Sequence, residues 1–279
     1  EPLYGRPTSK FTLLPFTIDV LKQIMHDHQP EYKAEDLLCL YMITGGVAKY
    51  VELLMDAGCY TKTKMLNYVC RQDSYFLSEG KDLLNQEFGD DSSTYFSILQ
   101  LVASGLTRRT DIDGAMQKDM GTYLQNLEQN FRMLARQKPL LAKPGSKTTA
   151  YEISDQFLRF WFRFVWPYQS LVERQQLGLV RQNMEYEQFS GRTLEQYFQQ
   201  KMMETGQYTL VGNWWDRKGV NEIDLIALNE FDKTGIVAEV KRQAQRISLK
   251  VLEEKTAALP PSDIGKYSLS MCGLSMEDM

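Results

Sequence analysis

Three ionisable residues interrupt two apolar runs in the last quarter of the chain, and their types fit phosphodiester hydrolysis. Asp224 lies in the run 221–228, and Glu239 and Lys241 end the run 235–241. Carboxylate oxygens are the ligands that hard divalent cations prefer, and a nearby ammonium can offset the charge that develops when water attacks a phosphate. Because charges inside strands are costly to desolvate unless they pair or bind a metal, we interpret the three residues as a site.

Two adjacent strands must position these residues. Both runs are rich in Ile, Val, Leu and Ala, and residues 229–235 between them predict the loop of a hairpin. Side chains alternate along a strand, so Glu239 and Lys241 should lie on one side together with Val237. Apolar residues occupy both faces of both runs, which is typical of central strands. The alternative interpretation is a Glu239–Lys241 ion pair on a solvated edge strand.

An amphipathic helix over 191–202 is predicted to cover this sheet. Glu195 is spaced at i, i+3 and i+7 with Phe198 and Met202, so it lies on the apolar face and should point at the strands. The remaining elements predicted here are a strand at 207–211, a loop at 213–219 that contains Trp214 and Trp215, a helix at 248–259 and a strand at 266–272. Residues 187–279 therefore predict the order αβββαβ.

An Asp on one strand and Glu-x-Lys on the next resemble the signature of the PD-(D/E)xK nuclease superfamily, which has the restriction-endonuclease-like fold. The resemblance implies that Asp224 and Glu239 hold Mg²⁺. It also implies that Lys241 positions or activates the attacking water, and that Glu195 is a further catalytic residue on the preceding helix. The domain expected from this resemblance is 187–279.

A second resemblance concerns the first 85 residues. Leu-Tyr-Gly-Arg at 3–6, Leu-Pro-Phe at 14–16 and Gly-Gly-Val-Ala-Lys-Tyr at 45–50 are similar to the end of the ATPase domain and the helical lid of prokaryotic AAA+-related (STAND-like) ATPases. In that family a winged helix and a restriction-endonuclease-like domain follow. The sequence contains no G-x-x-x-x-G-K-[ST] string, so we expect ATP to bind only to an intact protein that includes the missing N-terminal half. Within 1–85, helices are predicted at 18–28, 34–41 and 47–55, and a short strand or extended segment at 11–16.

Residues 86–155 predict a winged helix-turn-helix. Three helical segments are followed by two strands, at 133–135 and 150–153, that flank a wing loop with turn chemistry at 143–147. Several basic residues are expected to contact DNA phosphates. Those in the winged-helix segment are Arg132, Arg136, Lys138, Lys143 and Lys147, and those that follow Lys241 in the chain are Arg242 and Arg246. Winged helices also bind proteins or pack domains together, and that alternative stays open.

Residues 156–186 are expected to be aromatic connecting helices. Seven of the twelve residues 157–168 are aromatic. A platform for stacking bases is conceivable, but aromatic residues on all sides of a helix are typical of burial, so we favour an interior helix between domains.

The composition is that of a soluble protein, with 43% hydrophobic and 24% charged residues. A net charge of −4 gives no overall attraction to nucleic acid, so DNA binding would depend on a local patch. The four cysteines form no CxxC pair and only two histidines occur, which argues against a zinc site. Without an apolar run of transmembrane length we expect no membrane partner and a cytoplasmic location.

These features predict an α+β or α/β multidomain protein with a helical ATPase-lid remnant, a winged helix-turn-helix and a restriction-endonuclease-like αβββαβ domain. The predicted function is that of the C-terminal region of an AAA+-superfamily ATP-binding protein that carries a Mg²⁺-dependent DNA nuclease-like effector. The alternative is a non-catalytic regulatory switch that binds DNA or a protein partner.

Overall fold

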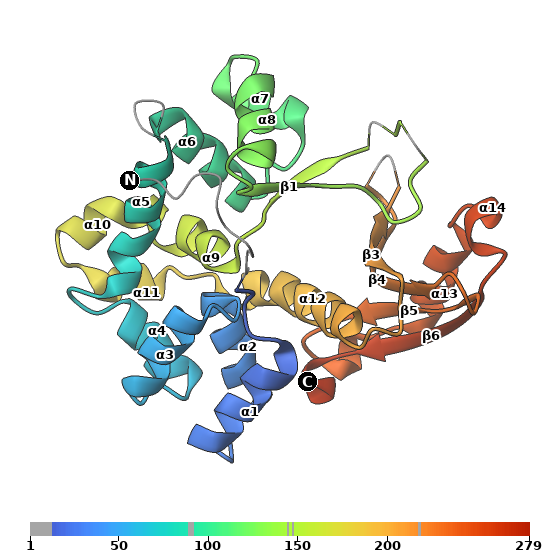
Figure 1. The fold of residues 1–279 in the computed structure, drawn as a ribbon, viewed down its shortest axis with the longest axis horizontal. Helices are drawn as coiled ribbons and strands as arrows, with labels where there is room; N and C mark the ends of the chain where they lie inside the picture. The colour runs from blue at the N-terminus through green and yellow to red at the C-terminus, as the bar shows by residue number, and fades with distance from the viewer. Residues whose placement is uncertain (1–12, 89–91, 144, 147, 217–218) are drawn as a thin grey trace, which may run out of the picture.

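The computed structural model describes residues 13–88, 92–143, 145–146, 148–216 and 219–279. In that part the chain is an α+β protein with a two-stranded and a four-stranded sheet (Figure 1). None of its described helices is both long enough and apolar enough to cross a membrane.

Helices form the N-terminal part of the chain. They are α1 (Ile18–His28), α2 (Ala34–Thr44), α3 (Ala48–Asp56), α4 (Lys62–Val69) and α5 (Tyr75–Phe88). The helices expected at 18–28, 34–41 and 47–55 are confirmed within three residues at each end. Helix α5 continues through residue 85, where the sequence suggested a domain boundary.

Two glycines make the turn between α2 and α3. Gly45 ends α2 with φ +56°, and Gly46 follows with φ +81°, in the left-handed region that favours glycine. The backbone of Phe16 donates to the Gly46 carbonyl at 2.7 Å, and a Cβ on Gly46 would lie 2.5 Å from the Phe16 carbonyl oxygen. The two described motifs at 14–16 and 45–50 therefore pack together. Residues 13–16 form no strand, and the motif at 3–6 lies outside the described residues.

The segment predicted as a winged helix has three helices and a hairpin. These are α6 (Ser92–Ala103), α7 (Arg109–Met116), α8 (Gly121–Gln129), β1 (Leu134–Gln137) and β2 (Ala150–Ile153). The strands pair antiparallel from Leu134↔Ile153 to Gln137↔Ala150. After β1 the chain reaches the larger sheet, where the Leu140 N–H donates to the Asn213 carbonyl at 2.8 Å. The segment that leads from β1 to the expected wing loop is thus bound to the larger sheet.

The aromatic segment lies in the interior. It comprises α9 (Gln156–Phe164), a 3₁₀ turn (Trp166–Tyr168), α10 (Gln169–Glu173) and α11 (Leu177–Gln182). The aromatic side chains of α9 are all buried, and α9 packs against α2, α5 and α6. A Cβ on Gly80 of α5 would lie 2.3 Å from the Trp161 ring, so only glycine allows this approach. The expectation of an interior helix is confirmed.

The C-terminal part is a four-stranded sheet with helices on both faces. Its elements are α12 (Tyr186–Glu204), β3 (Leu210–Trp215), β4 (Glu222–Asn229), β5 (Thr234–Val240), a 3₁₀ turn (Ala244–Arg246), α13 (Leu249–Ala257), α14 (Pro261–Ile264), β6 (Ser268–Leu274) and a 3₁₀ turn (Met276–Asp278). The strand order is β3-β4-β5-β6, antiparallel except for the parallel pair β5–β6. Apart from the short α14, the elements follow the predicted order.

Alternate residues of β4 and β5 face the two helical layers. Leu225 and Ala238, which are paired, belong to the apolar core that includes α12 residues. The neighbouring pair Ile226 and Val237 packs with Leu252 of α13. Both strands are central, so the edge-strand alternative is wrong. The expected loop at 213–219 is also wrong in part, because β3 continues through residue 215 after a register shift between residues 212 and 214.

Candidate active site

Asp224, Glu239 and Lys241 meet at one end of the central strands. The Lys241 Nζ lies 2.8 Å from Asp224 Oδ2 and 3.7 Å from Glu239 Oε1. The carboxylate side chains are 9% and 7% exposed, whereas the lysine is 34% exposed. The three residues that the sequence singled out therefore form one cluster, with two nearly buried carboxylates and an ammonium that reaches water.

Backbone amides fix both carboxylates. Asp224 Oδ2 accepts a hydrogen bond from the Val240 N–H at 2.9 Å, across the hairpin. Glu239 Oε2 accepts one from the Ser248 N–H at 2.9 Å, and Lys255 Nζ of α13 lies 3.8 Å from Glu239 Oε1. The Val240 N–H lies at the end of β5 and the Ser248 N–H lies at the start of α13. The sheet and α13 therefore set the direction of the two carboxylates.

Lys241 carries a stabilised positive charge. Its partial burial favours the neutral amine, but the hydrogen bond to Asp224 and the charges of Asp224, Glu239 and Glu195 outweigh that effect and raise the pKa of Lys241. Lys241 is therefore a positively charged ammonium group at neutral pH.

Glu195 faces the same cluster from α12. Burial raises the pKa of Glu195 to about 8, and the negative charge of Asp224 adds to the rise, while Arg192 and Lys241 oppose it. Around neutral pH Glu195 therefore holds a proton that it can exchange. Its position confirms the expectation that this helical Glu points toward the strands.

Asp224 and Glu239 offer the oxygen ligands that hard cations prefer. The part of the chain that the structure describes contains no group of three or more His, Cys, Asp or Glu residues arranged to hold a metal. Mg²⁺, however, commonly uses one or two carboxylates together with waters and substrate phosphates. Asp224 and Glu239 are such a pair, and they are the residues that would hold the cation.

Two clefts reach this cluster. The smaller, of about 290 Å³, is lined by Gln188, Gly191, Arg192, Glu195, Glu222, Val240, Lys241 and Arg242. The larger, of about 500 Å³, lies between the segment predicted as a winged helix and the four-stranded sheet. Arg192, Glu195 and Glu222 line both clefts, so the larger one joins the smaller one beside Lys241, which contacts Asp224 and Glu239; the described lining of the clefts does not include these two carboxylates themselves.

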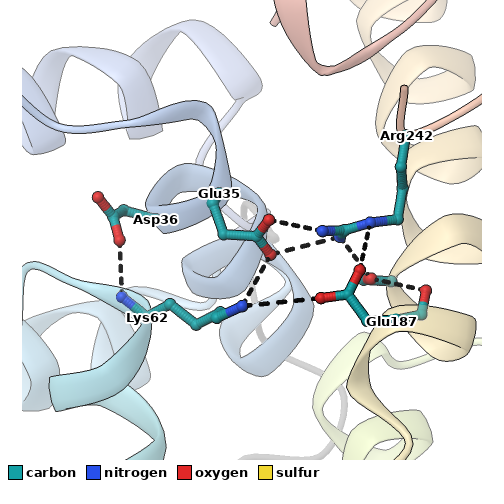
Figure 2. A network of polar contacts seen from close by, with 6 residues as sticks. Glu35, Asp36, Lys62, Glu187 and Arg242 are labelled. Atoms are coloured by element: carbon teal, nitrogen blue, oxygen red, sulfur yellow. Dashed lines mark hydrogen bonds and ion pairs between the residues drawn. The ribbon is translucent and has the colours of Figure 1, made fainter. Parts of the chain in front are cut away.

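Arg242 is held in an ionic network and is not a free surface cation. Its Nη2 lies 2.6 Å from Glu35 Oε2 of α2, its Nε 2.9 Å from Glu187 Oε2 of α12, and its Nη1 donates to Ser190 Oγ at 2.6 Å. Lys62 completes the network at 3.5 Å from Glu35 and 3.9 Å from Glu187 (Figure 2). The residue next to Lys241 therefore ties the N-terminal helices to the sheet.

The other expected DNA-binding residues are scattered. Arg136 pairs with Glu128 at 2.7 Å, whereas Lys138 lines the larger cleft. The side chains of Arg132, Lys143 and Arg246 are exposed, and Lys147 lies outside the described residues.

Sequence reasoning missed two cationic residues of the larger cleft, Arg108 and Arg192. A signal existed for Arg192, which lies three residues before Glu195 and so is its neighbour on the helix surface. No comparable pattern marks Arg108.

One of the comparisons with known proteins matches the part of the chain that contains the cluster. Residues 161–257 match the DUF234 family, described as archaeal and bacterial proteins of unknown function, and this range contains the whole Asp224, Glu239, Lys241 and Glu195 cluster. An uncharacterized protein of Methanocaldococcus jannaschii is 30% identical over 255 residues, which make up 86% of this chain and 55% of that protein. The chain thus spans about half the length of that relative. No solved structure matches the chain.

Proposed function

We propose that residues 186–274 form a Mg²⁺-dependent phosphodiesterase of the PD-(D/E)xK type that cleaves DNA. The observation that carries the proposal is the cluster itself: two nearly buried carboxylates and one ammonium at the same end of β4 and β5, the two central strands. Burying two carboxylates is costly even with Lys241 and Lys255 beside them, which supports a functional rather than a purely structural role.

Each residue has a role in the proposed reaction. Asp224 and Glu239 would hold Mg²⁺, which polarises the phosphate and lowers the pKa of bound water. Lys241 stays protonated and can donate a hydrogen bond to the attacking water or to a phosphate oxygen. Glu195, whose pKa is about 8, can exchange a proton at neutral pH during departure of the leaving oxygen.

We further propose that this domain is the effector of an AAA+-superfamily ATP-binding protein. In support, the N-terminal helices pack directly on α12: Tyr41 Oη donates to Gln200 Oε1 at 2.7 Å, and the Ile18 N–H donates to Glu204 Oε2 at 2.8 Å. The Arg242 network adds a third link. Movement of an ATPase half attached to these helices would reach the helix that carries Glu195.

An end-labelled oligonucleotide assay tests the proposal. Single-stranded and duplex DNA are incubated with the wild type in Mg²⁺, in Mn²⁺ and in EDTA. The comparison includes Asp224→Asn and Glu239→Gln, with Glu253→Gln as the matched control because Glu253 is exposed on α13. We expect metal-dependent cleavage that falls at least about 10²-fold in the two site variants and is unchanged in the control. Lack of cleavage by the wild type, or equal cleavage by all variants, would reject the proposal.

A non-catalytic regulatory switch that binds DNA or a protein is the second candidate. The observation in its favour is that Lys241, Lys255 and two backbone amides already compensate both carboxylates without a cation. Its expected result in the same assay is DNA binding without cleavage under every metal condition.

A further inference from the structure

The larger cleft lies between the segment predicted as a winged helix and the C-terminal sheet with its helix α12. On one side it is lined from the segment predicted as a winged helix, with Arg108 and Lys138 among the lining residues. On the other side it is lined by α12 and β3, with Arg192 and Trp215. In Figure 1 the strand β1 and the loop after it extend over α12 toward β3.

The loop after β1 closes this cleft on the side of β3. The Leu140 N–H donates to the Asn213 carbonyl at 2.8 Å, and Leu140 and Leu141 pack against the apolar cluster that contains Trp214. Because the loop is bound by both a backbone hydrogen bond and apolar contacts, the two walls are held at a fixed separation.

Three described cationic residues line the cleft. Among the described residues, Arg108, Lys138 and Arg192 have no carboxylate within 4.0 Å of a side-chain nitrogen. Glu152, the carboxylate on the side of the winged-helix segment, is instead compensated by Arg159 at 3.0 Å. The other acidic lining residues, Glu195 and Glu222, lie together with Arg192 where the cleft joins the smaller one beside Lys241.

The half-buried Trp215 also lines the cleft, as does Tyr151, which is only 5% exposed. Proteins that bind unpaired nucleic acid combine a cationic groove, which follows the phosphates, with aromatic side chains on which bases stack. A volume of about 500 Å³ lies in the range of sites that enclose a small ligand, which suits single nucleotides of an unpaired strand.

We propose that this cleft binds an unpaired nucleic-acid strand and leads it to Asp224 and Glu239. Arg108, Lys138 and Arg192 contact the phosphates, and Trp215 stacks on a base. This inference rests on the proposed function and specifies its substrate as single-stranded.

Binding is measured in EDTA, so that it does not depend on cleavage. The probes are fluorescent oligothymidylate and oligouridylate of about twelve nucleotides, and the duplex of the same length. The test variant Arg108→Glu with Lys138→Glu is compared with Lys64→Glu with Lys81→Glu, which makes the same charge change at two exposed lysines of α4 and α5. Trp fluorescence of the wild type and of Trp215→Phe reports base stacking.

We expect the test variant to bind the single strand at least tenfold more weakly, with a log–log salt slope reduced by about 1.4, since each phosphate contact to a single strand contributes about 0.7. The control pair should lower affinity less than threefold. Binding should quench the fluorescence in the wild type and much less in Trp215→Phe.

Three results would overturn the inference: no binding of either single strand by the wild type, equal losses in the test and control pairs, or a duplex that binds as tightly as the single strands. The outcome is separable from that of the cleavage assay. If Asp224→Asn abolishes cleavage while the test variant binds normally, the cleft inference falls and the nuclease proposal stands. If the test variant loses binding but the wild type never cleaves, the cleft inference stands and the nuclease proposal falls.

Discussion

The proton on Glu195 predicts a specific pH dependence of stability. The pKa of Glu195 rises from 4.5 to about 8 in the folded protein, so the folded state binds this proton more tightly than the unfolded state does. A pKa difference of one corresponds to about 1.36 kcal/mol, so the difference between 4.5 and about 8 sets an upper limit of about 5 kcal/mol on the stability change. Because Glu195 is partly exposed at the cleft, solvent screening should reduce the stability change linked to its proton to about 2–3 kcal/mol.

The sign follows from linkage. The stabilisation is fully present below the unfolded pKa of 4.5 and is lost as the pH rises through about 8, where the buried carboxyl ionises. Glu195→Gln keeps the shape of the neutral acid but cannot ionise. Its stability should match the wild type near about pH 5 and exceed it by about 2–3 kcal/mol near about pH 8.5.

Urea unfolding in EDTA at the two pH values measures this difference. The control is Glu253→Gln, which makes the same substitution at an exposed glutamate of α13. Other titrating groups contribute equally to all three proteins and cancel in the comparison. If the wild type and Glu195→Gln lose stability in parallel as the pH rises, then Glu195 is not a buried neutral acid and its assignment to the site is refuted.

Three further predictions concern the charges around the site. In calorimetry Asp224→Asn should lose the binding of Mg²⁺ or Mn²⁺ that the wild type shows, because one of two protein ligands is gone; equal binding would count against a metal site there. Lys241→Met should lower the free energy of unfolding in EDTA by about 1–3 kcal/mol, less than for a fully buried pair, and should be largely rescued by Mg²⁺ while cleavage stays low. Arg242→Gln should destabilise the protein by about 1–3 kcal/mol because Glu35 loses its closest cation, whereas Arg246→Gln, at an exposed position, should change stability by less than about 0.5 kcal/mol. A loss as small for Arg242 as for Arg246 would mean that the network contributes nothing to folding.

The elements that the sequence predicted well are those with strong local signals. The hairpin of β4 and β5 follows from its apolar runs, and α1 begins and ends at the predicted residues 18 and 28. Convergence of Asp224, Glu239 and Lys241 was also predictable, because hairpin geometry fixes which residues lie side by side.

Features that depend on distant contacts were not predictable. Trp214 and Trp215 continue β3 because they pair with Ile223 and Glu222, although the sequence around them has turn character. Arg242 was expected at the surface, but Glu35, which binds it, lies 207 residues away in the chain. Arg108 lines the cleft because its guanidinium reaches the vicinity of Gly219, which lies between β3 and β4 and is distant in the chain.

The most direct test of the proposed site is the position of a bound cation. A crystal of the protein soaked in Mn²⁺ should show an anomalous peak within about 2.1–2.3 Å of one carboxylate oxygen from each of Asp224 and Glu239, with Lys241 moved off the Asp224 oxygen that it contacts at 2.8 Å without metal. No peak between the two carboxylates, with Lys241 still bound to Asp224, would contradict the metal-dependent mechanism.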